Sequence, residues 1–228
     1  MDLFSSAWGI LATAIPVVIA ITFHEAAHGY VAWRLGDNTA KVLGRVTFQP
    51  LRHVDLYGTI IIPALLLLFR APFLFGWAKP VPVNFANLRN PRRDMVWVAA
   101  AGPGVNLLLA ALSGLLIHLA PFFPAAVAGW LSQNLVNSIL INLVLAVFNM
   151  LPLPPLDGGR VAVGLLPRPL AWQLARLERV GLLIVILLIF VLPMIGREVG
   201  LDLNILHWLV SGPVEFLFRA VLNLTGHL

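Results

Sequence analysis

Residues 3–34 read LFSSAWGILATAIPVVIAITFHEAAHGYVAWR, and this stretch determines the class of fold. From Leu3 to Phe23 it holds no charged residue, and its length suits the roughly 20 apolar residues that a helix needs to cross a bilayer. It then carries His24-Glu25-Ala26-Ala27-His28 and ends at Arg34-Leu35-Gly36-Asp37-Asn38, a charged helix stop rich in Gly and Asn. We therefore expect a membrane helix over about residues 6–34 with ionisable side chains inside it.

The composition of the whole chain agrees with this expectation. It is 60 % hydrophobic and 11 % charged, whereas a soluble domain has roughly 25 % charged residues. The net charge of +5 comes from Lys and Arg between the apolar runs, so we interpret it as membrane topology and expect no nucleic-acid partner. Signal-peptide cleavage at Ala12-Thr13-Ala14 would cut the first helix, so we expect this helix to be retained. We expect a single membrane domain over 1–228, with a catalytic core at about 6–160 and C-terminal helices at about 178–226.

The rest of the chain predicts further membrane helices and one unusual element. Apolar runs recur at 95–119, 131–151, 180–195 and 204–224. Residues 40–58 mix apolar and charged side chains with Gly and Pro, which is typical of short strands or a hairpin. The run 59–77 could span on length, but basic residues flank both its ends, so we favour a re-entrant element. The expected fold is an all-α polytopic membrane protein of about 5–6 transmembrane helices, with a small re-entrant or β-hairpin element after the first helix.

The ionisable cluster in the first helix indicates zinc chemistry. On a helix, His24 and His28 lie on the same face, so both imidazoles can bind one Zn²⁺ while Glu25 reaches a water molecule on the metal. The alternative is an inert set of polar residues at a helix end, but ionisable groups in a membrane span are costly and usually functional. We expect one Zn²⁺ per chain, with Glu25 as the general base that passes a proton from water to the leaving amine.

The third zinc ligand must be His or a carboxylate, because the chain has no Cys. Asp157 is the candidate, since it follows an apolar helix through the proline-rich turn 152–155. Unwound backbone at membrane depth is tolerated only where it is buried in protein or lines a wet cavity. Two alternatives stay open: Asp157 as the capping carboxylate of an Asx turn, and Glu178 as the third ligand in its place.

Three motifs in this order resemble those of the site-2 protease family of intramembrane zinc metalloproteases, with a similarity that covers about Thr22 to Arg160. They are His24-Glu25-Ala26-Ala27-His28, Ala101-Gly102-Pro103-Gly104-Val105-Asn106, and Asn149-Met150-Leu151-Pro152 leading to Leu156-Asp157-Gly158. The resemblance implies zinc on His24, His28 and Asp157 and Glu25 as the base. It also implies that Asn149 and Asn106 hydrogen-bond the substrate backbone or the developing oxyanion. The implied activity is cleavage within or near transmembrane segments of membrane proteins, by a small form without the PDZ or CBS domain of many members.

The stretch Gly76–Asn84 has prolines at alternate positions, which excludes a helix and a central strand. A substrate helix must unwind before it is cut, and its freed backbone groups then need new hydrogen bonds. Val81 and Val83 keep their N–H groups, so we predict that they pair with the substrate along one edge. A plain extended connector is the alternative.

Two other functions compete with the site-2 protease hypothesis. One is a membrane zinc protease of the prenyl-protein or heat-shock type, with Glu178 as the third ligand. The other is a non-enzymatic metal carrier or channel that uses His24, His28 and Asp157 as a transit site. The Lys and Arg positions predict an outside N-terminus and an active site toward the cytoplasmic side of a prokaryotic-type cell membrane. The expected partners are the lipid bilayer and transmembrane substrates.

Overall fold

The computed structural model describes residues 7–69 and 76–228, and in these ranges the chain is helical and has no strand. The longest helices are α1 (Ala7–Arg34), α4 (Pro91–Ile117), α5 (Ala125–Asn149) and α10 (Ile205–Leu224). Shorter α-helices are α2 (Thr39–Val42), α3 (Ile62–Leu68), α6 (Asp157–Leu165), α7 (Arg168–Arg176), α8 (Glu178–Ile186) and α9 (Leu192–Val199). Short 3₁₀ and π segments are η2 (Pro50–His53), η3 (Leu56–Ile61), η4 (Phe85–Asn87), η5 (Ala120–Phe122) and η6 (Leu187–Val191).

Five helical stretches in the described ranges are long and apolar enough to cross a membrane. They are Leu11–Arg34, Pro91–Ile117, Ala125–Asn149, Glu178–Val199 and Ile205–Leu224. The fourth stretch consists of α8, η6 and α9 in direct succession. These spans coincide with the apolar runs of the sequence, so the prediction of a polytopic helical membrane protein is confirmed.

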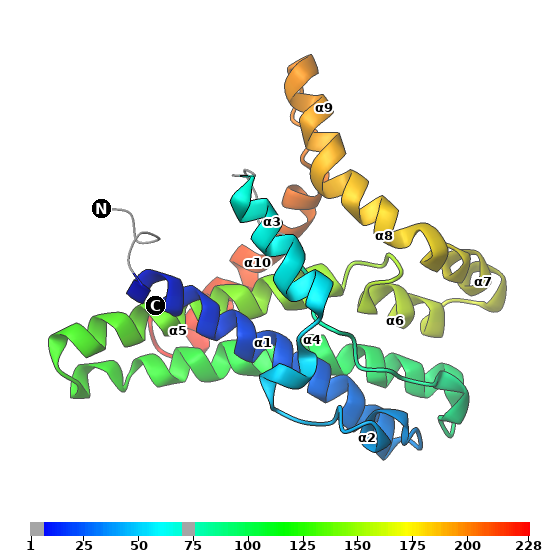
Figure 1. Cartoon of the computed structure of the whole chain (residues 1–228), viewed down its shortest axis with the longest axis horizontal. Coiled ribbons are helices and arrows are strands. Elements are labelled where there is room, and N and C mark those ends of the chain that lie inside the picture. The colour runs from blue at the N-terminus through cyan, green and yellow to red at the C-terminus, as the bar shows by residue number, and fades with distance from the viewer. Residues whose placement is uncertain (1–6, 70–75) are drawn as a thin grey trace.

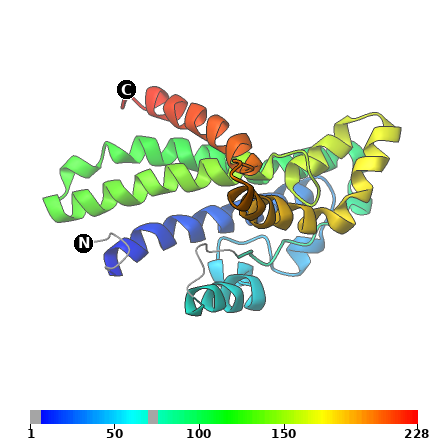
Figure 2. The ribbon, with the colours of Figure 1, turned by 90° about the horizontal axis from the view of Figure 1, so that it is seen from above.

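Helices α1, α4 and α5 lie side by side and form the body of the molecule (Figures 1 and 2). Helix α10 packs against α4 and α5 on the side away from α1 (Figure 2). The apolar core between these helices contains Ala110, Ile139, Leu143, Val214 and Val221. Small side chains such as Ala110 let membrane helices approach closely, which suits the packing of α4 against α5 and α10.

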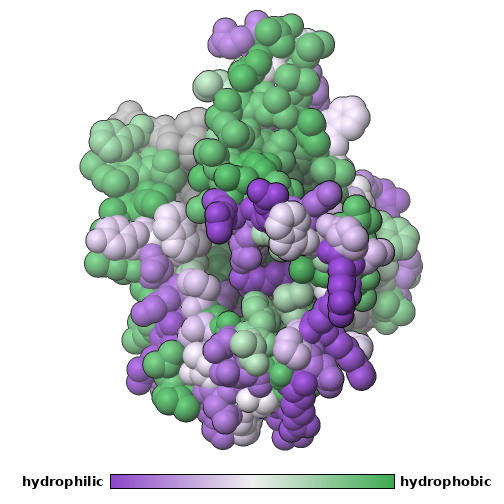
Figure 3. Space-filling model, turned by 90° about the vertical axis from the view of Figure 1, so that its right-hand side faces the viewer, coloured by the Kyte–Doolittle hydropathy of each residue, from purple (hydrophilic) through white to green (hydrophobic). Residues whose placement is uncertain are grey.

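Two parts of the chain project from this body: α3, and the α8–α9 stretch (Figure 1). Both are covered by apolar side chains, whereas hydrophilic side chains gather on the lower part of the end of the molecule that faces the viewer in Figure 3. At this end α1 stops and α4 begins, and Lys and Arg are frequent in residues 34–52, 79–93 and 160–179. The helix bundle therefore has one strongly basic end.

The expected β-hairpin after the first helix is wrong, because the described residues between 39 and 69 form α2, η2, η3 and α3 instead. The mixed apolar and charged pattern is typical of strands, but a strand needs a partner to pair with, and the described residues contain no strand. Part of the backbone hydrogen bonding of this region is local. Asp55, for example, caps η3 by accepting hydrogen bonds from the N–H groups of Tyr57 and Gly58 at 3.1 and 2.7 Å.

The two flanks of the run 59–77 lie against each other, as an element that returns to its starting side requires. Trp77 N–H donates to the Gly58 carbonyl at 3.1 Å, and the Thr59 hydroxyl donates to the Trp77 carbonyl at 2.9 Å. Lys79 N–H donates to the His53 carbonyl at 2.9 Å. Residues 70–75 of this predicted re-entrant run lie outside the described residues.

Candidate active site

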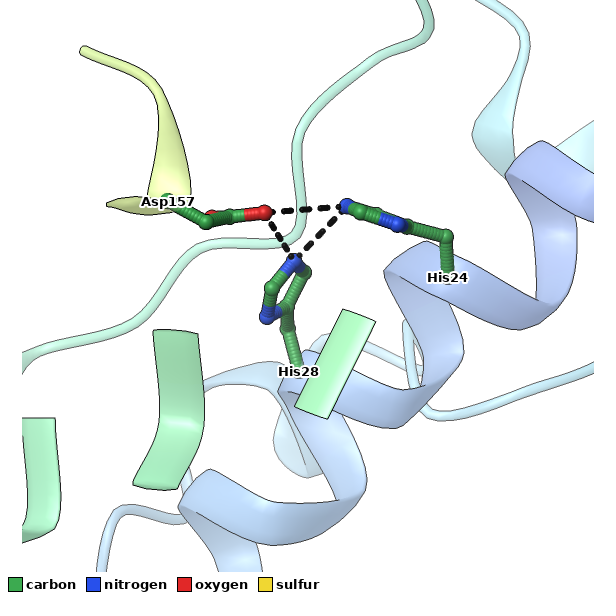
Figure 4. Close-up of side chains that lie close together, drawn as sticks. All are labelled: His24, His28 and Asp157. Atoms are coloured by element: carbon green, nitrogen blue, oxygen red, sulfur yellow. Dashed lines mark hydrogen bonds and ion pairs between the residues drawn. The ribbon is translucent and has the colours of Figure 1, made fainter. Parts of the chain in front are cut away.

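The structure brings His24, His28 and Asp157 together at one centre, between α1 and the beginning of α6 (Figure 4). The Nε2 atoms of His24 and His28 are 3.0 Å apart, and Asp157 Oδ2 lies 3.1 and 3.3 Å from them. All three side chains are buried. In the described part of the chain, no other group of His, Cys, Asp and Glu has ligand atoms this close together. Asp157, not Glu178, therefore joins the two histidines.

The hydrogen bonds behind the two imidazoles determine which nitrogen faces the centre. The Nδ1 atom of His28 lies 2.7 Å from the Val98 carbonyl, which can only accept, so this nitrogen carries the proton. His24 Nδ1 lies 2.6 Å from Asn106 Oδ1, so it also donates. Each neutral imidazole consequently presents the Nε2 lone pair to the centre, as a metal ligand does.

The orientation of Asn106 is itself determined by a buried network. Its Nδ2 donates to Asn142 Oδ1 at 2.8 Å and to the Ala20 carbonyl at 3.3 Å, which leaves Oδ1 to face His24. Asn142 in turn donates to the Ser138 carbonyl at 2.8 Å. Both Asn106 and Asn142 are 0 % exposed. Asn106 thus orients a histidine from a fully buried position, and its contact with a substrate stays a prediction.

The centre fits a cation and has room for one. Two imidazole lone pairs and a carboxylate converge there, and Asp157 Oδ2 is a buried atom with no hydrogen-bond donor among the described residues. Three such groups repel one another unless a positive charge lies between them. A Cβ added at Gly102 would lie 2.6 Å from His24 Nε2, so this glycine keeps the space beside the imidazoles open. Two histidines, one carboxylate and an open side match the ligand set of a catalytic zinc.

Asp157 reaches the centre because α5 ends and the chain turns back. Helix α5 stops at Asn149, and Asp157 begins α6 after a turn stabilised by the Leu156 N–H to Leu153 carbonyl bond at 2.9 Å. A Cβ at Gly158 would overlap the Met150 carbonyl, and one at Gly159 would overlap the Pro154 backbone. The two glycines therefore let α6 start directly against the turn, which aims Asp157 at α1.

Glu25 is bound by the 76–84 segment, which the sequence predicts to pair with the substrate. Val81 N–H donates to Glu25 Oε2 at 2.7 Å, and Val81 itself is buried. Further along, Asn84 N–H donates to Asp37 Oδ2 at 2.8 Å. The 76–84 segment thus forms neither helix nor strand, as its alternate prolines predict, and it pairs with side chains and single carbonyls.

Asp37 anchors the end of this segment from the loop after α1. It is 0 % exposed and accepts hydrogen bonds from Asn84 N–H, Asn87 Nδ2, and the N–H and hydroxyl of Thr39. Burial acts to raise the pKa of its carboxyl, but the hydrogen bonds from Thr39, Asn87 and Asn84 outweigh burial and lower this pKa below its ordinary value. In the sequence Asp37 is recognisable only as part of a helix stop, and no local pattern marks it as an anchor.

Asn149 and Val83, the other predicted substrate contacts, interact within the protein as follows. Asn149 donates through Nδ2 to the Leu145 carbonyl at 3.0 Å, one turn back in α5. Val83 packs beside the buried cluster of Ala32, Leu88 and Val98. Glu178 instead lies at the surface, where its carboxylate is 3.5 Å from Arg160.

Comparison with known proteins places these residues in a family context. Residues 112–192 match the model of peptidase family M50. The chain is 41 % identical over 184 residues to YwhC of Bacillus subtilis, named as a candidate zinc metalloprotease, and the match covers 79 % of this chain and 80 % of YwhC. It is 30 % identical over 167 residues to MJ0611 of Methanocaldococcus jannaschii, which bears the same description, with 73 % and 75 % covered.

A relative that matches over a smaller share of the chain is Rip2 of Mycobacterium tuberculosis, also named as a candidate zinc metalloprotease. It is 32 % identical over 141 residues, which are 62 % of this chain and 52 % of Rip2. No solved structure matches the chain. The extent of the match to YwhC, together with the family model, shows that the chain belongs to peptidase family M50, the site-2 proteases.

Proposed function

We propose that this protein is an intramembrane zinc endopeptidase, which hydrolyses peptide bonds within or near transmembrane segments of membrane proteins. The observation that carries the proposal is the convergence of His24 Nε2, His28 Nε2 and Asp157 Oδ2 within 3.3 Å of one another. This centre lies among helices that are long and apolar enough to cross a bilayer. The zinc metalloprotease names of the M50 relatives support the same metal and reaction.

In this proposal each residue of the centre has one task. His24, His28 and Asp157 hold the metal, and Asn106 and the Val98 carbonyl keep the two imidazoles in the binding tautomer. Zinc bound there supplies a Lewis acid that activates water and polarises the peptide carbonyl.

Glu25 is the general base of the proposed reaction. The Val81 N–H occupies Glu25 Oε2 and holds the carboxylate in one orientation, which leaves the other oxygen to take a proton from water and deliver it to the leaving amine. Pairing of a substrate with the Val81 amide would have to displace Glu25. We therefore assign Val81 to the base, and we keep Val83 and Asn149 as proposed substrate contacts.

The proposed active site faces the cytoplasm. The basic residues that precede and follow the long helices gather at the end where α1 stops and α4 begins, and loops rich in Lys and Arg stay in the cytoplasm. We propose a prokaryotic-type cell membrane and transmembrane proteins as substrates.

Metal analysis of purified variants tests the zinc ligands. We expect one zinc per wild-type chain and at least a tenfold loss of affinity in Asp157→Ala, because one of three ligands is removed. Glu178→Ala is the matched control and should hold zinc like the wild type. Loss of zinc in Glu178→Ala with full retention in Asp157→Ala would favour the prenyl-protease type of site instead.

Glu25→Gln separates the protease from a metal carrier. This variant should keep its zinc and lose peptide hydrolysis, because the amide cannot accept the proton. A carrier would work equally well with an amide in place of this carboxylate. Proteomic comparison of membranes that contain the wild type or Glu25→Gln would show which membrane proteins accumulate uncleaved.

A further inference from the structure

An apolar cavity of about 340 Å³ lies between α1 and the segments that follow it. One wall is a face of α1 that includes Val18, Ile21 and Thr22, and the opposite wall is formed by η2 and by residues 76–78. Ile21 and Thr22 precede Glu25 by about one helical turn, which is about 5 Å along the axis. The cavity therefore adjoins the proposed base and lies at the depth of the apolar part of α1.

His53 gives this mainly apolar cavity a polar atom without a hydrogen-bond partner among the described residues. It lines the cavity and is only 3 % exposed. Its Nε2 lies 2.9 Å from the Thr47 carbonyl and must donate, which leaves Nδ1 as an acceptor. Nδ1 is buried and has no hydrogen-bond partner among residues 7–69 and 76–228. Buried acceptors are normally satisfied, so a donor from a bound molecule would stabilise this site.

Two glycines show that the cavity wall is closely built. A Cβ at Gly58 would lie 2.5 Å from the Trp77 ring, and a Cβ at Gly76 would lie 2.5 Å from the Gly58 carbonyl oxygen. Any larger residue at either position would force the two segments apart. The shape of the cavity thus depends on the close approach of the chain at Gly58 to the chain at Gly76 and Trp77.

We propose that this cavity is a side-chain subsite that takes an aromatic residue with a hydrogen-bond donor, Tyr or Trp, close to the scissile bond of the substrate. The subsite rests on the proposed protease function. An extended chain advances about 3.3 Å per residue, so a cavity one helical turn from Glu25 corresponds to a position one or two residues from the cleaved bond. The ring fills the apolar space, and its O–H or N–H donates to His53 Nδ1.

Binding to an inactive variant tests the subsite without requiring turnover. The chain has no Cys, so Glu25→Gln with Val18→Cys carries a single thiol in the cavity wall. The rate at which a maleimide labels this thiol is measured in detergent, with increasing concentrations of a synthetic apolar peptide. Three peptides are compared, which differ at one position and carry Ala, Phe or Tyr there. We expect the Tyr peptide to protect the thiol best, at roughly fivefold to tenfold lower concentration than the Phe peptide, since the two peptides differ by one hydrogen bond. Ala should protect least.

Variants of His53 identify the acceptor. His53→Leu should remove the preference for Tyr over Phe and keep that for Phe over Ala, whereas His53→Gln, which restores an acceptor, should keep both. A thiol at Val144, which is exposed on α5, is the control and should not be protected. Normal zinc content would show that each variant is folded.

Several outcomes would overturn the subsite. Equal protection by Ala and Tyr, no protection by any peptide, or a Tyr preference that survives in His53→Leu would each exclude it. Protection that follows the phospholipid concentration alone would identify an acyl chain as the occupant. None of these results changes the zinc content or cleavage by the wild type, so failure of the subsite and failure of the protease proposal are separate.

Discussion

At the scale of single residues, the metal centre depends on the glycine at position 102 as much as on its three ligands. Gly102 and Gly104 both lie in α4, two residues apart, and the sequence alone treats them alike. A Cβ at Gly102 would meet both imidazoles of the centre, while one at Gly104 would have no atom within 4 Å. Small residues in membrane helices therefore have different roles according to what they face.

This pair makes a direct prediction. Gly102→Ala should reduce zinc affinity at least tenfold, because the added methyl group displaces His24 and His28 from each other and from Asp157. Gly104→Ala should bind zinc like the wild type and be unchanged or more stable, by up to about 1 kcal/mol, since Ala favours a helix over Gly. Competition with a zinc chelator measures the affinity. Equal zinc binding by both variants would contradict the role assigned to Gly102.

At the scale of elements, side chains from three other parts of the chain hold the 76–84 segment. Arg45 Nη2 donates to the Lys79 carbonyl at 2.7 Å, Val81 N–H to Glu25, and Asn84 N–H to Asp37. The prolines between these positions have no N–H to satisfy. Together with the backbone bonds from Trp77 N–H to Gly58 and from Lys79 N–H to His53, these side-chain partners hold the segment in place of a neighbouring strand.

Asp37 should consequently make stability depend on pH. Its pKa is lowered in the folded protein, so its contribution is present above the unfolded value of about 3.9 and is lost as the pH falls through the folded value. Asp37→Asn should lower the free energy of unfolding by about 2 kcal/mol at pH 7, because it loses charge-assisted hydrogen bonds.

Thermal unfolding in detergent, with a chelator in every sample, measures this difference between wild type and Asp37→Asn. The difference should shrink as the pH is lowered below about 4. Thr59→Ala is a suitable comparison, because it removes a hydrogen bond from the same region without changing a titratable group. A difference between wild type and Asp37→Asn that is constant with pH would show that the charge of Asp37 does not stabilise the segment.

At the scale of the whole molecule, the arrangement of the helices predicts the topology. The loop after α1 and the segment before α4 are joined by the bond from Asn87 Nδ2 to Asp37 Oδ1 at 3.0 Å, so they must lie on one side of the membrane. The beginning of α5 lies at the other end of the bundle (Figure 1). The chain between α1 and α4 therefore returns to its starting side.

Single cysteines at Asn38, Ala86 and Ala126 can check this topology, because the chain has no Cys of its own. A membrane-impermeant maleimide should label Ala126→Cys in intact cells, and Asn38→Cys and Ala86→Cys only in inverted vesicles. Labelling of Ala86→Cys from the same side as Ala126→Cys would mean that the run 59–77 crosses the membrane.

The sequence by itself determined the spans, the paired histidines and the position of Asp157 after a broken helix. These features are local: a long apolar run must enter lipid, and residues four apart on a helix share a face. The tertiary structure alone decided that residues 39–69 form no hairpin, that Asn106 supports His24, and that Val81 binds Glu25. His24 and Asn106 are 82 residues apart in the chain, and Glu25 and Val81 are 56 apart. A polar group buried in lipid must find a partner, but which distant segment provides it depends on how the helices pack, and no local pattern records that.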